Sequence, residues 1–334
     1  MGLEIIWFIL IAVLFIGFFF LEGFDFGVGI LLLLIGKKDE EKRVIINSIG
    51  PFWDGNEVWL ITAGGAIFAA FPIWYATMFS GFYLALLVIL VALILRGVAF
   101  EFRSKNDGEK WRRNWDYTIF GSSALLAILW GVAFANLIKG VPIDGSINYV
   151  GNFFNLISIY TLVGGITTLL IFMFHGAIFL SLKTEGVIEE RAISIAKPLG
   201  ICAIVSGVIL TILTYFQTDL FNNKFAVVSI VAALVFISLS CYLINHHKAK
   251  IAMITNGLSI ALSVAALFLG LFPRVMVSSI KPEFSLTITN ASSSPGTLLL
   301  MTKIALIFVP IVLVYQIWSY WVFRKRVTTK DLKY

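Results

Sequence analysis

The chain has 334 residues, of which 59% are hydrophobic and 13% are charged, whereas an ordinary soluble domain carries about a quarter charged residues. This composition excludes a water-soluble fold, which could not cover so much apolar surface. The formal net charge of +6 does not require a nucleic-acid partner, because basic loops beside anionic lipid headgroups account for it.

Long apolar stretches fill nearly the whole chain. A helix that crosses a bilayer needs roughly 20 mostly apolar residues, because lipid offers no partner to an unpaired backbone N–H or C=O group. One transmembrane domain covering residues 1–334 is therefore expected. The stretches predict an all-α, polytopic membrane bundle with about nine transmembrane helices, at 5–35, 48–72, 74–98, 115–138, 151–182, 196–216, 224–245, 250–271 and 298–323.

The second of these helices is the weakest, since it carries Asp54 and Glu57 and a tight turn at Pro72 links it to the third. An arrangement with eight spans therefore stays open. With nine spans, 20 of the 25 Lys and Arg residues fall in the loops, the termini or the adjoining helix ends on one side of the membrane. Short cytoplasmic loops retain basic residues, so the sequence predicts an N-terminus outside the cell and a C-terminus in the cytoplasm.

The first two predicted helices each carry two acids three residues apart, Glu22 with Asp25 and Asp54 with Glu57. Residues at this spacing share one face of a helix. A charged group at mid-bilayer costs a few kcal/mol, so these side chains should face the protein interior or water. Counted at about 1.5 Å per residue from the cytoplasmic side, the two pairs lie at similar depth.

Four converging carboxyls cannot all ionise cheaply in a low-dielectric interior, so at least one should hold a proton that it can pass on. The acids therefore predict a proton relay. The alternative is that they only form ion pairs with Arg96 or Arg103, or hydrogen-bond the glycine-rich backbone around them. Arg96, Glu101 and Arg103 lie near the cytoplasmic end of the third helix, where we expect a structural cluster of ion pairs.

Histidine is scarce, because the chain contains only His175, His246 and His247. A haem or metal bound by this chain alone would need several ligands that meet across helices. No metal site and no cofactor of its own are therefore predicted. His175 is expected to serve packing or hydrogen bonding, and the pair at 246–247 to cap the end of a helix.

Two long motifs carry a family resemblance. Residues 22–29, Glu-Gly-Phe-Asp-Phe-Gly-Val-Gly, and residues 47–72, which include Gly-Pro-Phe-Trp-Asp-Gly-Asn-Glu-Val-Trp, resemble the first two helices of subunit II of cytochrome bd-type quinol oxidases. The resemblance covers the chain from end to end and is densest before residue 155. Shorter matching motifs lie at 79–83, 100–105, 112–116, 131–136, 151–154, 272–273 and 278–279.

The resemblance implies a bacterial respiratory terminal oxidase in the cytoplasmic membrane. In that family a separate catalytic subunit I holds two b-type haems, a haem d and the main quinol site, and subunit II is its haem-free partner. The complex oxidises quinol, reduces O₂ to water and draws protons from the cytoplasm. The resemblance also allows a small single-helix subunit and a quinone bound to this chain, alongside membrane lipids.

Carried over by position, Asp54 beside Trp53 matches the family's proposed proton-channel acid at the subunit interface, and Asp25 matches the other buried acid. Glu22 stands where some members have Asp. The resemblance thus implies a proton path through Asp25 and Asp54, with Glu22 and Glu57 tuning them, and no catalytic residue in this chain. The alternatives are a stand-alone ion-coupled transporter, which also has acids at mid-membrane, and an oxidase subunit that acts only as a scaffold.

Overall fold

A computed structural model describes residues 2–331. Apolar side chains surround most of its helices, which is typical of segments packed in protein and lipid instead of water. The α-helices are α1 Leu3–Ile35, α2 Asp39–Ile49, α3 Trp53–Ala70, α4 Pro72–Gly81, α5 Tyr83–Phe102, α6 Glu109–Lys139, α7 Ile159–Lys183, α8 Val187–Gln217, α9 Lys224–Asn245, α10 Ala249–Leu271 and α11 Pro295–Val322. Short 3₁₀ turns are η1 Arg103–Lys105, η2 Phe153–Leu156, η3 Leu220–Asn222, η4 Pro282–Phe284 and η5 Thr329–Asp331.

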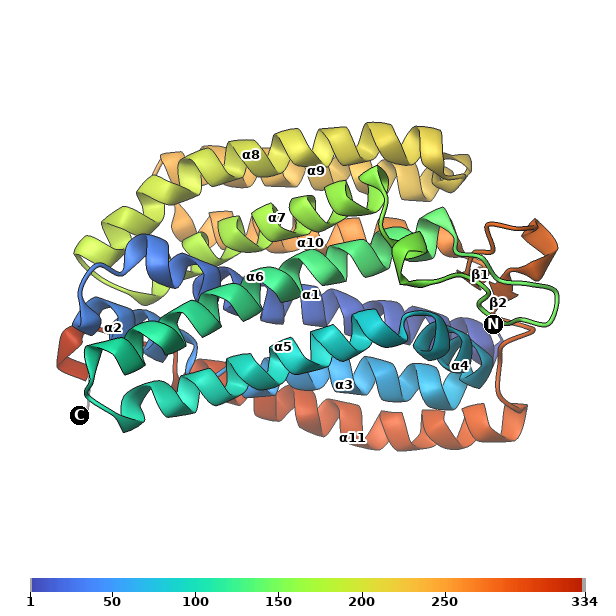
Figure 1. Ribbon diagram of the computed structural model, residues 1–334, viewed down its shortest axis with the longest axis horizontal. Helices are drawn as coiled ribbons and strands as arrows, with labels where there is room; N and C mark the ends of the chain where they lie inside the picture. The colour runs from blue at the N-terminus through green and yellow to red at the C-terminus, as the bar shows by residue number, and fades with distance from the viewer. Residues whose placement is uncertain (1, 332–334) are drawn as a thin grey trace.

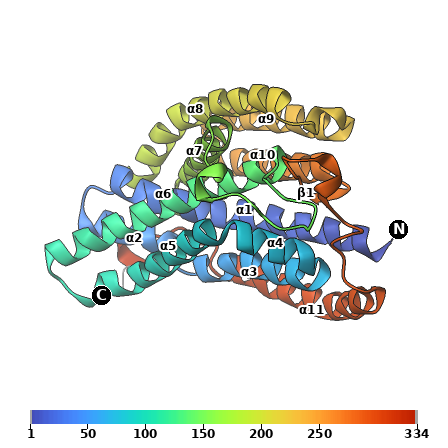
Figure 2. The ribbon, with the colours of Figure 1, turned by 45° about the vertical axis from the view of Figure 1, so that its right-hand side comes forward.

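The long helices lie side by side along the long axis of the molecule (Figure 1). Helix α1 lies in the middle and packs against α3, α6, α7 and α10. Helices α8 and α9 form one outer layer and α11 lies on the opposite side, an arrangement that the turned view repeats (Figure 2). The acids of α1 are therefore enclosed by helices from both halves of the chain.

Glycines let α1 and α7 approach closely next to the acidic motif. A Cβ atom on Gly27 would overlap the backbone oxygen of Phe172, and one on Gly176 would lie 2.5 Å from the carbonyl carbon of Gly27. Such contacts between small residues are how membrane helices pack when no water drives them together. The close approach fixes the height of α7 beside the acids of α1.

Four of the predicted helices differ clearly from the structure. The fifth begins at Ile159 instead of 151, after the short turn η2, and the sixth begins at Val187 instead of 196. The second begins at Trp53 instead of 48, because the preceding residues form the separate amphipathic helix α2 and Pro51 has no N–H to continue it. The third is split at Phe82, whose φ of −97° and ψ of 13° interrupt the helix between α4 and α5. Pro72 begins α4, where the missing N–H of proline is harmless.

Eight helices of residues 2–331 are long and apolar enough to cross a membrane: α1, α5 with η1, α6, α7, α8, α9, α10 and α11. The 18-residue α3 is not among them, since Asp54, Asn56 and Glu57 lie in its first turns. It nevertheless packs along α1 inside the bundle (Figure 1). The number of crossings and their orientation stay predictions.

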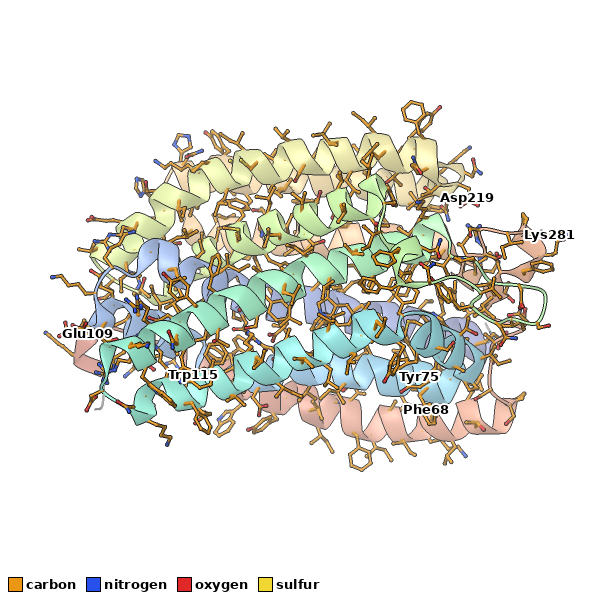
Figure 3. The ribbon with its side chains drawn as sticks, in the orientation of Figure 1. Phe68, Tyr75, Glu109, Trp115, Asp219 and Lys281 are labelled. Atoms are coloured by element: carbon orange, nitrogen blue, oxygen red, sulfur yellow. The ribbon has the colours of Figure 1, made fainter. Side chains whose placement is uncertain are left out.

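The two ends of the bundle carry different structural elements, the short helix α2 at one end and a small β-sheet at the other. Helix α2 lies at the end where α6 begins, near the labelled Glu109 and Trp115, while Asp219 and Lys281 mark the other end (Figure 3). That other end carries a small antiparallel sheet, in which β1 Arg274–Met276 pairs with β2 Leu286–Thr287. Their register pairs Arg274 with Thr287 and Met276 with Leu286.

Candidate functional site

The acids of α1 lie in the interior of the bundle. Glu22 and Asp25 stand one turn apart on the same face, and both residues are fully buried. Buried acids are stable only when other polar groups meet them, because lipid and apolar side chains solvate charge poorly. Two neighbouring helices, α3 and α5, supply those groups.

Arg96 of α5 is the cation of this site. Its Nη1 lies 2.5 Å from Oε1 of Glu22 and 2.8 Å from Oε1 of Glu57. Arg96 is fully buried, and its guanidinium carbon lies 4.8 Å from the ring centre of Phe26 and 5.2 Å from that of Phe100. The aromatic faces stabilise the cation where water is absent.

Asp25 is held by an amide instead of a cation. Nδ2 of Asn56 donates to Oδ2 of Asp25 at 2.6 Å, and Asn56 is fully buried. The amide oxygen of Asn56 accepts from the hydroxyl of Tyr320 at 2.9 Å and from Nε2 of Gln316 at 3.4 Å. We call Glu22, Asp25, Glu57, Arg96 and Asn56 the Arg96 cluster.

The Arg96 cluster contains two acidic oxygens that no donor reaches. Among the described residues, Oε2 of Glu22 and Oδ1 of Asp25 are buried and have no hydrogen-bond partner when both groups are ionised. The two carboxyls lie within reach of a side-chain hydrogen bond to each other once one of them carries a proton. A proton shared by Glu22 and Asp25 would therefore satisfy both oxygens.

The structure brings together three of the four predicted acids. Asp54 is exposed on the first turn of α3, one turn from Glu57, whose side chain is 19% exposed. Trp53 is half-buried, and its ring packs on Phe100 at 5.3 Å between centres. Asp54 thus lies beside the Arg96 cluster, at the surface, and does not enter it.

The predicted ion-pair cluster of Arg96, Glu101 and Arg103 needs correction. Arg96 belongs to the Arg96 cluster, while Arg103 turns to the end of the bundle, where it pairs with Asp39 at 2.8 Å and with Asp116 at 2.5 Å. Glu101 is exposed on α5 and forms no ion pair within the described residues, because its side chain faces outward.

A second ion-pair network therefore joins α2, α6 and the loop after α5. Asp39 also pairs with Arg112 at 2.8 Å, and Asp116 pairs with Lys42 at 2.9 Å. Nearby, Glu41 accepts from the backbone N–H groups of Lys37 and Lys38 and pairs with Arg191. Burial acts to raise the pKa of Glu41, but these donors outweigh it and leave the pKa below its ordinary value.

His175 is a hydrogen-bonding residue of the interior. It is fully buried; Nδ2 of Asn256 donates to its Nδ1 at 3.0 Å, so the other nitrogen carries the proton and donates to the carbonyl oxygen of Phe20 at 3.0 Å. With both ring nitrogens engaged, His175 does not fit a ligand of haem or metal. Residues 2–331 also contain no group of three or more His, Cys, Asp or Glu side chains arranged to hold a metal ion.

The sequence reasoning missed Asn56, Gln316 and Tyr320. Asn56 lies inside the second motif, and its spacing of three from Trp53 and from Trp59 gives it no distinctive signal. Tyr320 is 264 positions away from it along the chain. Gln316 and Tyr320 are polar side chains in a mostly apolar last helix, which was the available signal, and both contact residues of α3.

Comparisons of the sequence with known proteins agree with one another. The model of the family described as cytochrome bd terminal oxidase subunit II matches residues 3–323. Cytochrome bd ubiquinol oxidase subunit 2 of Bacillus subtilis is 45% identical over 332 residues, which cover 99% of this chain and 98% of that protein. Cytochrome bd-I ubiquinol oxidase subunit 2 of Escherichia coli K12 is 36% identical and covers 99% of this chain and 97% of its own length.

The fold has a counterpart among solved structures. A chain from the structure of bd oxidase from Geobacillus thermodenitrificans matches with a TM-score of 0.78, over 96% of this chain and 97% of that chain. The two are 16% identical, so this likeness concerns the fold alone. The family model and the curated relatives together show that the chain belongs to the cytochrome bd terminal oxidase subunit II family.

Proposed function

We propose that this chain is the haem-free accessory subunit of a membrane-bound quinol:O₂ oxidoreductase, and that its Arg96 cluster forms part of the path that carries cytoplasmic protons to O₂ reduction. Family membership implies a subunit I partner and haem in the complex, in the bacterial cytoplasmic membrane. The relatives described above are oxidase subunits, so the alternative of a stand-alone transporter has no support from them.

The observation that carries the proton path is the charge balance of the Arg96 cluster. Three carboxyls, on Glu22, Asp25 and Glu57, face one guanidinium. If all were ionised, the buried site would have surplus negative charge, which is strongly unfavourable in a low-dielectric interior. The cluster therefore keeps at least one proton on a carboxyl next to other carboxyls that can receive it.

Exposure suggests the direction of the path. Asp54 is exposed, Glu57 one turn further along α3 is 19% exposed, and Glu22 and Asp25 are fully buried. A proton that enters at Asp54 would meet progressively drier acids. Asp54 and Glu57 belong to the entrance in this proposal, and the shared oxygens of Glu22 and Asp25 to the interior store.

The haems belong to the partner in this proposal. His175 is fully engaged by Asn256 and Phe20, and the described residues offer no other internal histidine. The residues present therefore do not fit a haem bound by this chain alone. Two b-type haems and a haem d on subunit I would supply the redox chemistry.

A quinone is the second molecule that this chain would bind. A cavity of about 700 Å³ lies between α1, α3, α4, α5 and α6, and its lining is almost entirely apolar. Trp74 and Trp130 line it, and their indole N–H groups have no partner within residues 2–331. Phe68 and Tyr75, labelled in Figure 3, contribute to the wall where α3 turns into α4. Apolar walls of this kind suit the ring and the isoprenoid tail of a quinone.

A small single-helix subunit completes the proposal. Helix α11 offers a surface for it, since Leu298 is its one buried residue. Its exposed side chains are long and apolar, as the surface of a helix that meets lipid or another membrane helix should be.

The proton path is tested by Asp25→Asn in the assembled complex. Asn keeps the shape of the side chain but cannot carry the proton, so we expect O₂ turnover with quinol to fall by roughly tenfold or more while the haem spectrum stays intact. Asp54→Asn should slow turnover less, because Asp54 lies outside the Arg96 cluster and Glu57, whose side chain is 19% exposed, remains to receive protons. Glu101→Gln is the matched control and should turn over normally.

Wild-type turnover in a fully assembled Asp25→Asn complex would contradict the proton path and favour the scaffold role.

The quinone proposal is tested by a separate measurement, the quinone content of the purified complex. Replacement of Trp74 and Trp130 by Phe should lower that content, and unchanged content would remove the cavity from consideration.

A further inference from the structure

The side-chain amide of Asn56 has two orientations, which exchange its oxygen and its nitrogen. Only one of them places the N–H donor against Asp25. We infer that Trp59, Gln316 and Tyr320 are positioning residues that fix this amide, so that a proton passing through Asp25 is carried on Oδ1, toward Glu22. The inference rests on the proposed proton path and adds to it a device that determines where the proton is held.

One end of the hydrogen-bond chain is fixed by Trp59. An indole N–H can only donate, and Nε1 of Trp59 donates to Oε1 of Gln316 at 2.8 Å. The amide nitrogen of Gln316 is thereby turned away from Trp59, and it donates to Oδ1 of Asn56 at 3.4 Å. A donor-only group on α3 thus determines the orientation of an amide on α11.

The hydroxyl of Tyr320 reinforces the same orientation. It donates to Oδ1 of Asn56 at 2.9 Å. The ring of Tyr320 stacks on Phe52, with centres 4.4 Å apart and planes 12° apart. Because the ring is held by stacking, its hydroxyl is directed to one place, and the oxygen of Asn56 meets two donors.

The other end of the chain is fixed by acceptors. Nδ2 of Asn56 lies 2.6 Å from Oδ2 of Asp25 and 3.5 Å from the carbonyl oxygen of Leu21, which can only accept. A flipped amide would place its oxygen against both of these oxygens. All the contacts of Asn56 therefore agree on one orientation.

The consequence falls on the two oxygens of Asp25. Oδ2 already receives an N–H, so a proton placed there would collide with the Asn56 donor, and the proton is left for Oδ1. On Glu22, Oε1 is occupied by Arg96 at 2.5 Å, which leaves Oε2 as the receiving atom. These are the two buried oxygens that have no donor among the described residues.

The transfer of the proton from Asp25 to Glu22 needs no further reactant. The O–H bond on Oδ1 of Asp25 breaks as an O–H bond forms on Oε2 of Glu22, and no electron changes place. Asp25 becomes an anion that accepts from Asn56, and Glu22 becomes neutral while it still contacts Arg96. If the Asn56 amide turned, its oxygen would repel the Asp25 anion and the transfer would be less favourable.

The test uses the assembled complex with Trp59→Phe, Tyr320→Phe and the double substitution, each of which removes one donor and keeps a ring. Tyr215→Phe and Tyr242→Phe are matched controls, because these side chains lie on α8 and α9, away from α3 and α11, and both are 59% exposed. We expect each single variant to slow O₂ turnover roughly threefold to tenfold, as for the loss of one hydrogen bond, and the controls to match the wild type.

Infrared difference spectroscopy separates positioning from general support. The carbonyl stretch of protonated Asp25, identified by its loss in Asp25→Asn, should shift to higher frequency in the double variant, because Oδ2 loses its steady N–H donor. An unchanged band and normal turnover in the double variant, with Asp25→Asn slow, would overturn the positioning role and leave the proton path standing. Normal turnover in Asp25→Asn would overturn both.

Assembly is checked by haem content in each sample. If the Trp59 variant fails to assemble, Gln316→Met tests the same link, since it keeps the length of the side chain and removes both polar atoms. A shifted band and slowed turnover in Gln316→Met support the positioning role, and wild-type values for both overturn it.

Discussion

At the scale of single residues, Arg96 determines what the buried acids can do. It holds Glu22 and Glu57 on the same nitrogen, and two of its other nitrogens, Nε and Nη2, have no partner within residues 2–331. A buried cation with spare donors is more than a structural ion pair needs. When the negative charge moves from one carboxyl to another, the guanidinium can donate to the newly charged group through a different nitrogen while the Arg96 side chain stays where it is.

Replacement of Arg96 by Met should destabilise the protein strongly. Removal of one partner from a buried ion pair leaves uncompensated charge and costs about 3–5 kcal/mol. We expect a clear fall in the melting temperature of the purified complex, measured by intrinsic fluorescence. The double variant with Glu22→Gln should recover part of the loss, since one of the stranded charges is then removed; a double variant no more stable than Arg96→Met would contradict this account.

The sequence predicts the acids of this site but not their partners. Glu22 and Asp25 stand out because an ionisable group within an apolar helix has few structural uses. Asn56 carries no charge, and the spacing of residues along α3 says nothing about what α11 places opposite it. The exposure of Asp54 likewise depends on how α3 is rotated about its axis, which the sequence of α3 does not reveal because its apolar residues favour no single face.

At the scale of elements, the glycines of α1 and α7 decide whether the acids are positioned correctly. A Cβ on Gly27 would meet the backbone of Phe172, which cannot move as a side chain tip can. Gly27→Ala should therefore force α1 and α7 apart and destabilise the fold by roughly 1–3 kcal/mol.

Gly64→Ala is the matched control for this prediction. Nothing lies within 4 Å of a Cβ built on Gly64 of α3, so the added methyl group meets open space. Thermal unfolding of the two variants in the same detergent gives the comparison. Equal melting temperatures for Gly27→Ala and Gly64→Ala would show that the close approach of α1 and α7 is not a constraint on stability.

Helix α2 should make the stability of its end of the bundle depend on pH. The pKa of Glu41 lies below its ordinary value, so its ionised form is favoured by folding. Its contribution is present above the unfolded pKa, about 4.3, and is lost as the pH falls through the lower folded value. We expect the wild type to lose roughly up to 1 kcal/mol more than Glu41→Gln on acidification through this range. Parallel loss in both would assign the acid sensitivity to other groups.

The sequence predicts the long helices well and the short ones poorly. Apolar composition marks the long membrane helices, because a bilayer-spanning helix requires about 20 mostly apolar residues in a row. Helix α2 has 11 residues and begins with Asp39, Glu40 and Glu41, so it resembles a loop in hydropathy. The break at Phe82 leaves no trace in composition, since an aromatic residue is equally at home within a membrane helix.

At the scale of the whole molecule, ion pairs join the segment after α1 to the loop between α5 and α6. Asp39, just after α1, lies 2.8 Å from Arg103 and 2.8 Å from Arg112, which flank the loop between α5 and α6. The chain between these points leaves that end of the bundle along α3 and returns along α5. The loop after α1 and the loop after α5 must therefore lie on the same side of any membrane around the bundle.

This geometry favours nine crossings, with α3 as the second, and it gives a test of topology. In a variant lacking Cys202 and Cys241, single cysteines at the exposed positions Lys38, Asn106 and Ser146 would report sidedness through a membrane-impermeant maleimide. We expect Lys38→Cys and Asn106→Cys to be protected in intact spheroplasts and to react after lysis, as the excess of basic residues in those loops requires, while Ser146→Cys reacts in both. Labelling of Lys38→Cys and Asn106→Cys from opposite sides would mean eight crossings. It would also separate Asp39 from Arg103, so the ion pairs that close the cytoplasmic end of the proton path could not form.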